Sequence, residues 1–159
     1  MGSGAREVEE AVIKARGWHE WLFRLSLKQA RAELALACAD WPEAATLATT
    51  ALQQSRTVAR GKYEAAALAV RAQALQELGQ TREAMRDAKA ACTTARRVGD
   101  PALQVRILGG LLPLTGDDKL RDETRGIIGK ILAALPNGTR RAFEEAPIVD
   151  AVLTGRTVS

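Results

Sequence analysis

The chain has 159 residues, of which 26% are charged and only 4% aromatic, and its formal net charge is +4. A chain of this length holds one or two compact units, and its core must be built mostly from Ala and Leu because aromatic side chains are so scarce. The mild basic excess falls well short of a dedicated nucleic-acid-binding arm, and no apolar run approaches the ~20 residues needed to span a bilayer.

Two short segments precede the main body of the chain. Residues 1–4 (Met-Gly-Ser-Gly) resemble a remnant of an expression vector, and no signal-peptide pattern opens the sequence. Residues 5–16 predict a helix with Val8 and Val12 on one face, and Gly17 ends it. We expect this helix to be the second member of a hairpin whose first member is missing.

A cluster of large apolar residues, Trp18, Trp21, Leu22 and Phe23, follows this helix. The open end of a stack of helices exposes an apolar face. Two interpretations therefore stand side by side. The cluster is internal core, or it is a surface through which the domain forms a homodimer or docks onto a preceding domain.

The central part of the chain alternates helical segments with short breakers. Asp40 and Asp100 stand before a first-turn region that contains Pro, which is typical of a helix start. Gly79 is expected to stop a helix, and Gly61 is expected to break the chain. The expected helices cover residues 18–39, 42–58, 62–78, 81–98, 102–114 and 119–135.

The C-terminal part is predicted to contain a loop at residues 136–139 (Pro-Asn-Gly-Thr). Short helices are expected at 140–146 and 147–153, with a break before the second because it begins with Pro. The polar residues 154–159 are expected to form a frayed, flexible tail. No linker is long enough to divide the chain, so residues 5–153 are interpreted as one domain.

The sequence matches itself at an offset of 40 residues. Residues 39–44 (Ala-Asp-Trp-Pro-Glu-Ala) align with residues 79–84 (Gly-Gln-Thr-Arg-Glu-Ala), and residues 31–32 align with 71–72. A self-match at this spacing predicts stacked helical hairpins. The few β-branched alternations in the chain disfavour strands.

Small residues recur in corresponding slots of the two copies, and their spacing resembles that of the tetratricopeptide-repeat family. These residues are Ala32, Ala39, Ala44 and Ala51 in one copy and Ala72, Gly79, Ala84 and Ala91 in the next. The resemblance covers roughly residues 20–135, although the repeat is longer than the family's ~34 residues. A third hairpin fits at Gly109 and Gly116 but has Leu120 or Arg121 in the Ala slot. The resemblance implies an all-α, right-handed superhelical stack of about three hairpins with extra terminal helices.

A narrower similarity concerns the function. The long helices and the ending at residues 140–149 are similar to the C-terminal repeat regions of large bacterial signalling ATPases, LuxR-type regulators and cyclase-linked proteins. This similarity implies a non-catalytic protein–protein interaction module, or scaffold, in the C-terminal part of a bacterial signalling or transcription-regulatory protein. The expected partner is a protein or peptide.

In this family, the first helices of successive hairpins line a concave surface. The resemblance implies that the corresponding surface of this chain contains Ser26, Ala66, Ala69 and Leu103. Polar groups beside them can bind a peptide by hydrogen bonds. The family's carboxylate clamp uses Lys and Asn, which are replaced here, so binding of a chaperone tail is disfavoured. An ordinary solvated surface is the alternative. The expected groove residues are Gln29, Glu33, Gln73, Gln76 and Arg106.

Two other functions stay open. The domain could sense a small effector in a pocket between hairpins. It could also bind nucleic acid through a convex stripe formed by Arg82, Arg86, Lys89 and residues 96–97. Acidic residues interrupt this stripe and it has no stacking aromatics, so a solvated face is favoured there.

The residues give no sign of catalysis. His19 is the only histidine, and it has neither a nucleophile nor an orienting partner in any recognisable pattern. Cys38 and Cys92 are interpreted as small buried residues in a reducing, cytoplasmic compartment, and they cannot make a typical zinc site with one His. We therefore expect no metal, no cofactor and no enzyme activity. Close helix packing is expected to explain the glycines Gly109, Gly110, Gly126 and Gly129.

Overall fold

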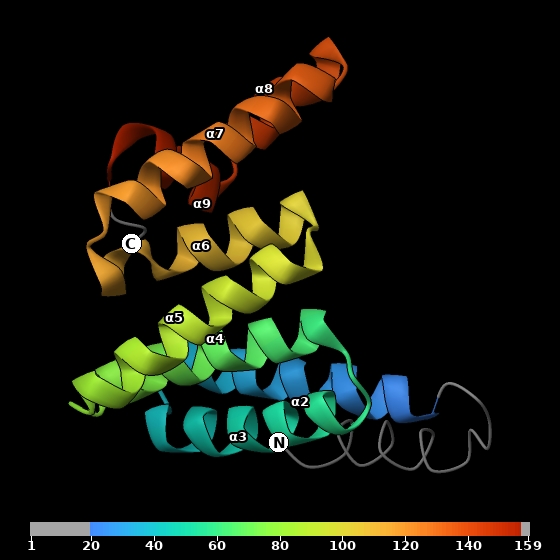
Figure 1. Ribbon diagram of the computed structural model, residues 1–159, viewed down its shortest axis with the longest axis vertical. Helices are drawn as coiled ribbons and strands as arrows, with labels where there is room; N and C mark the ends of the chain where they lie inside the picture. Colours follow the sequence, from blue (N-terminus) through green and yellow to red (C-terminus); the bar gives the residue numbers. More distant parts are fainter. Residues whose placement is uncertain (1–19, 157–159) are drawn as a thin grey trace.

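The computed structural model describes residues 20–156, and every regular element in that range is an α-helix (Figure 1). The predicted all-α class is therefore confirmed, and the six expected central helices agree with the structure to within two residues at each end. The elements are α2 (Glu20–Ala37), α3 (Trp41–Thr57), α4 (Gly61–Glu77), α5 (Thr81–Val98), α6 (Pro101–Thr115), α7 (Asp118–Ala134), α8 (Asn137–Glu144) and α9 (Pro147–Thr154).

Several expectations fall outside the described residues. The predicted helix at residues 5–16, Trp18 and His19 lie there, and so does the end of the polar tail. The backbone of Trp21 belongs to α2, but its side chain is not described.

Side-chain caps define three of the helix starts. Asp40, Asp100 and Asp117 each accept a hydrogen bond from at least one backbone N–H of the following turn. These N–H groups have no partner inside their own helix, so the carboxylates satisfy them and also oppose the positive end of the helix dipole. Pro42 and Pro101 stand in the first turn, where a missing N–H costs nothing.

The turns recur at intervals of 20 residues. Ala39, Ala59, Gly79 and Gly99 each have a positive φ, between 53° and 77°. In the first three turns the next amide bonds back to a carbonyl five residues earlier at 2.8 to 2.9 Å, which closes the preceding helix. The expectation that Gly61 breaks the chain is wrong, because Gly61 is the first residue of α4 and Ala59 makes the turn. Gly61 instead allows close packing, since a Cβ there would lie 2.7 Å from Val98 Cγ2.

From α2 to α7, consecutive helices pack against each other as antiparallel hairpins, and the hairpins stack along the long axis of the molecule (Figure 1). α4 occupies the middle of the stack and contacts α2, α3, α5 and α6. The contacts of α4 with α2 and α6 bring alternate helices together on one side of the stack. This side carries the pockets described below.

Six of the eight small-residue slots are buried inside the stack, whereas Ala39 and Gly79 lie in exposed turns. An Ala side chain lets two helix axes approach closely, so a core poor in aromatics can still be closely packed. The fully buried slot residues, each with 0% of its surface exposed, are Ala32, Ala44, Ala51, Ala72, Ala84 and Ala91.

The C-terminal helices close the stack in a way that the sequence only partly predicts. A Cβ on Gly109 would lie 2.8 Å from Ile148 Cγ2 and 3.2 Å from Val152 Cγ2, so α9 packs directly on the backbone of α6. Close packing therefore explains Gly109. It does not explain Gly126 or Gly129, because a Cβ at either position would meet no atom within 4 Å.

The predicted loop at residues 136–139 is wrong, since α8 begins at Asn137. Pro136 precedes it in an extended conformation (φ −60°, ψ 148°), and its carbonyl accepts from the amide and the hydroxyl of Thr139. Asn137 and Gly138 are poor helix formers. They stand in the first turn, however, where no intrahelical donor bond is required. The predicted break before Pro147 is present, and α9 begins there.

The two cysteines differ in their surroundings. Cys92 is buried, as expected, and burial raises the pKa of its thiol to about 11. Cys38 is exposed, so the expectation that it is buried is wrong. It lies one residue beyond α2, in the turn that connects α2 to α3. No helix in the described part of the chain is long and apolar enough to cross a membrane.

A buried ion pair joins the two helices of the central hairpin. Arg71 on α4 donates from Nε to Oδ2 of Asp87 on α5 at 2.6 Å and from Nη2 to Oδ1 at 3.1 Å. The side chain of Asp87 is only 3% exposed. Arg71 also reaches Thr49 Oγ1 on α3 at 3.4 Å, so a single guanidinium links three helices.

Candidate functional site

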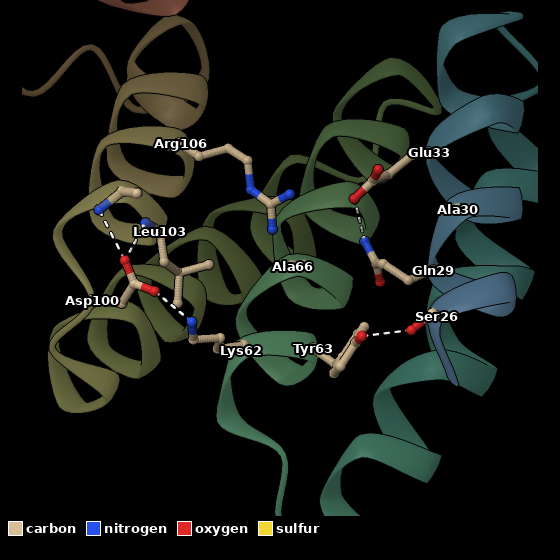
Figure 2. A pocket seen from close by; sticks show the side chains of 11 residues that line it. Ser26, Gln29, Ala30, Glu33, Lys62, Tyr63, Ala66, Asp100, Leu103 and Arg106 are labelled. Carbon is tan, nitrogen blue, oxygen red and sulfur yellow. Dashed lines mark hydrogen bonds and ion pairs between the residues drawn. The ribbon is translucent and has the colours of Figure 1, made fainter. Parts of the chain in front are cut away.

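Three alternate helices form a groove on one side of the stack. A pocket of about 470 Å³ lies between α2, α4 and α6. α4 supplies the floor at Ala66, while α2 and α6 supply the two walls (Figure 2). The small floor residue leaves the space that the pocket occupies.

The α2 wall carries a buried amide next to an exposed carboxylate. Gln29 is 5% exposed, and its Nε2 donates to Oε1 of Glu33 at 2.8 Å. These residues are four positions apart, so they share one face of the helix. Gln29 Oε1 is buried and accepts no hydrogen bond from the described residues. A buried acceptor without a donor is costly, and this amide oxygen is the least satisfied polar group of the pocket.

The α6 wall carries the opposite charge. Arg106 is exposed, and its guanidinium extends over Ala66 toward the wall that holds Glu33 (Figure 2). No described side chain forms a hydrogen bond or ion pair with Arg106. Among the described residues, the pocket therefore has an unpaired cation on one wall and, facing it, a carboxylate whose hydrogen bond comes from the Gln29 amide.

Two polar contacts close the end of the pocket nearest the starts of α4 and α6. Lys62 pairs with Asp100, which also caps α6, and the Tyr63 hydroxyl contacts the Ser26 hydroxyl (Figure 2). The Lys62 ammonium and the backbone N–H groups of the first turn of α6 hold the pKa of the Asp100 carboxyl below its usual range. These contacts tie α2 to α4 and α4 to α6, so they fix the spacing of the walls.

A second pocket, of about 550 Å³, lies further along α2, α4 and α6, and Trp41 of α3 also lines it. Leu36, Trp41, Pro113 and Leu114 give it apolar surface, and its polar groups are Gln73, Gln76 and the Glu77 carboxylate. Along α6, Arg106 and Pro113 are seven residues apart, which corresponds to about 10 Å of helix. The groove thus has a charged section, where Arg106 and Glu33 face each other, and further along a mostly apolar section that also contains Glu77.

The sequence-predicted groove residues fall on this one side of the stack, in two groups. Gln29, Glu33 and Arg106 line the charged pocket, whereas Gln73 and Gln76 line the apolar one. Gln73 is already engaged, because its Nε2 donates to the carbonyl of Gly110 at 3.1 Å and bridges α4 to α6. Of the neighbours named with them, Ser26, Ala66 and Leu103 line the charged pocket, while Ala69 is buried in the core.

The sequence analysis missed several pocket residues. Lys62, Tyr63 and Asp100 stand at or just before the starts of helices, and Trp41 belongs to a second helix of a hairpin. The prediction considered only the middle of the first helices. Aromatic and charged residues beside each turn could have suggested further pocket residues. Whether they meet in one pocket, however, depends on how the hairpins stack.

The predicted convex stripe is partly neutralised. Arg96 forms two hydrogen bonds with Glu123, at 2.7 and 2.8 Å, and Arg97 contacts Glu64 at 3.2 Å. The Arg96 guanidinium lowers the pKa of the Glu123 carboxyl, and Glu123 raises the pKa of Arg96. The Nε atom of Arg86 lies 3.7 Å from Oδ1 of the buried Asp87. Cations paired in this way are less available to phosphate groups.

The apolar cluster proposed for self-association can be followed for two of its four residues. Phe23 is 60% exposed, whereas Leu22 is half-buried. Trp18 and the side chain of Trp21 lie outside the described residues. Leu34, further along α2, is also 61% exposed. The outer surface of α2 therefore presents large apolar side chains at two separate points.

The described residues contain no group of three His, Cys, Asp or Glu side chains placed to hold a metal ion. No protein-family model matches the chain, and comparisons with curated proteins and with solved structures give no match either. The groove is therefore the feature of the molecule from which a function can be inferred.

Proposed function

We propose that this domain is a non-catalytic interaction module whose groove, formed by α2, α4 and α6, binds a segment of a partner protein. The observation that carries this proposal is the succession of two pockets along α2, α4 and α6, the first with opposed charges and the second with large apolar side chains beside Glu77. A ligand that fills both must extend for about 10 Å or more, as a chain does. Polar groups that set orientation beside an apolar anchor are typical of peptide recognition.

The resemblance of the repeats to the tetratricopeptide family supports the same proposal, and so do the contacts between the groove walls. The Lys62–Asp100 pair joins α4 to the start of α6, and the hydroxyls of Ser26 and Tyr63 join α2 to α4. A preformed site loses less entropy on binding than one that must order itself. In this proposal the domain belongs to a cytoplasmic signalling or transcription-regulatory protein, which the similarity of its long helices to those of bacterial regulatory proteins supports.

A second candidate function is the sensing of a small effector. It is favoured by the size of the charged pocket, about 470 Å³, and by the unsatisfied Oε1 of Gln29. Ligand pockets of ~300–1,000 Å³ with a few polar groups are usual for small molecules. For this second function, the groove holds a small effector, and its binding changes the activity of a neighbouring domain.

The experiment selects random linear peptides that bind the purified domain and measures their affinities for two variants. Ala30 lines the charged pocket and is exposed, so Ala30→Trp fills the groove without disturbing the core. The matched control is Ala142→Trp, at an exposed position on α8 away from the groove. We expect Ala30→Trp to weaken binding more than tenfold and Ala142→Trp to leave it unchanged, with the same helical content by circular dichroism. Selected peptides that bind both variants equally would refute a groove-binding function.

A further inference from the structure

We propose that the groove recognises an extended peptide segment in which an acidic and a basic side chain are adjacent and a large apolar side chain follows about three residues further on. This inference rests on the proposed function and specifies its ligand. The acidic side chain pairs with Arg106, the basic one with Glu33, and the apolar one occupies the pocket at Trp41 and Pro113.

The adjacency of the two charges follows from the geometry of the walls. Glu33 and Arg106 face each other across Ala66, at one level of the groove (Figure 2). Successive side chains of an extended chain point in opposite directions. A chain running along the groove therefore sends one side chain to α2 and the next to α6, so neighbouring residues must carry opposite charges.

The extended conformation follows from Gln29. Its Oε1 is buried without a donor, and its Nε2 is held by Glu33. When a basic side chain of the ligand pairs with Glu33, the side-chain amide of Gln29 loses its bond to Glu33 and can rotate toward the groove. It can then accept from a peptide N–H and donate to a peptide C=O. An extended chain offers these groups, whereas the interior of a helical ligand does not, because it uses them in its own hydrogen bonds.

The position of the apolar residue follows from the length of the groove. Arg106 and Pro113 are seven residues apart on α6, or about 10 Å. An extended peptide covers ~3.3 Å per residue, so the same distance corresponds to three residues. Trp41 is half-buried and Pro113 is exposed in the second pocket, and both offer apolar surface to a ligand side chain.

The test uses a capped synthetic peptide with the sequence Gly-Lys-Glu-Ser-Ser-Leu-Gly and a second peptide in which Glu is replaced by Lys. Fluorescence titration measures both against the wild-type domain, Arg106→Glu and Arg82→Glu. Arg82 is exposed on α5, outside the groove, so its reversal changes the net charge equally and serves as the control.

We expect Arg106→Glu to bind the first peptide about tenfold more weakly than the wild type does, because an attraction becomes a repulsion. We also expect it to bind the second peptide more tightly than the wild type does, whereas Arg82→Glu should match the wild type with both. Equal behaviour of the two variants would overturn the charge pattern, and so would failure of the first peptide to bind. The Ala30→Trp comparison separately decides whether the groove binds peptides at all. If the free dipeptide Lys-Glu binds as tightly as the full peptide, the ligand is a small effector and the extended-segment inference is overturned.

Discussion

Removing the buried carboxylate of Asp87 should destabilise this domain more than any change on its surface. Asp87 is held by two hydrogen bonds from Arg71, and its side chain is 3% exposed. Asp87→Asn keeps the size of the side chain but leaves the guanidinium without its counter-charge. Breaking a buried pair in this way costs about 3–5 kcal/mol.

The exposure of Arg71 places the effect at the lower end of that range. Its side chain is 19% exposed, so water can partly hydrate the orphaned guanidinium. We expect the free energy of unfolding of Asp87→Asn to fall by about 3 kcal/mol. Removing both charges should cost far less, because an apolar pair of similar volume replaces a buried ion pair at little expense. The double variant Arg71→Met with Asp87→Leu should therefore lie within about 1 kcal/mol of the wild type.

Equilibrium unfolding in urea measures these differences, provided that the slope of the transition is the same in all variants. Arg86→Ala is the control, since Arg86 also approaches Asp87, at 3.7 Å, but its side chain is 71% exposed. Its effect should stay within a few tenths of a kcal/mol. If Asp87→Asn loses less than about 1 kcal/mol, or if the double variant is as unstable as Asp87→Asn, the ion pair does not hold the hairpin in the way described.

Three further predictions concern turns, packing and thiols. Gly79→Ala should lower the free energy of unfolding by about 1 kcal/mol and Ala39→Gly should raise it similarly, because both positions have a left-handed φ; opposite signs would contradict this. Ala84→Leu should cost about 1–3 kcal/mol by overpacking a fully buried slot, and a melting temperature no lower than that of the wild type would count against that packing. Iodoacetamide at mildly alkaline pH should label exposed Cys38 quickly and Cys92 only slowly, because burial raises the Cys92 pKa to about 11; equal rates by mass spectrometry would refute the burial.

Part of the groove was predictable from the sequence and part was not. The periodic placement of Gln29, Gln73 and Arg106 on first helices was enough to put them on one side of a stack. The division of these residues between two pockets could not be predicted, because it depends on the offset between neighbouring helices along their axes. The contact between Ser26 and Tyr63 joins residues 37 positions apart, and no local pattern signals it.

Local chemistry in the sequence determined the helices and their turns. Caps such as Asp100, breakers such as Gly79 and the recurring small slots act within a few residues, so they can be recognised one segment at a time. Residues 136–139 look like a loop, yet α8 begins at Asn137, and the contacts at its start are local ones from Thr139 to the Pro136 carbonyl. Tertiary packing, by contrast, cannot be recognised one segment at a time. Gly109 is covered by α9, which lies about 40 residues further along the chain.

Only the tertiary structure decided which charges are buried and paired and which face the groove. Arg71 and Arg106 are both arginines on first helices, and nothing in their immediate sequence separates them. Stacking places Arg71 against Asp87 in the interior and leaves Arg106 above Ala66, across from Glu33. The physical reason is that the cost of burying a charge and the strength of its pairing depend on neighbours brought together by the fold, not on neighbours in the chain.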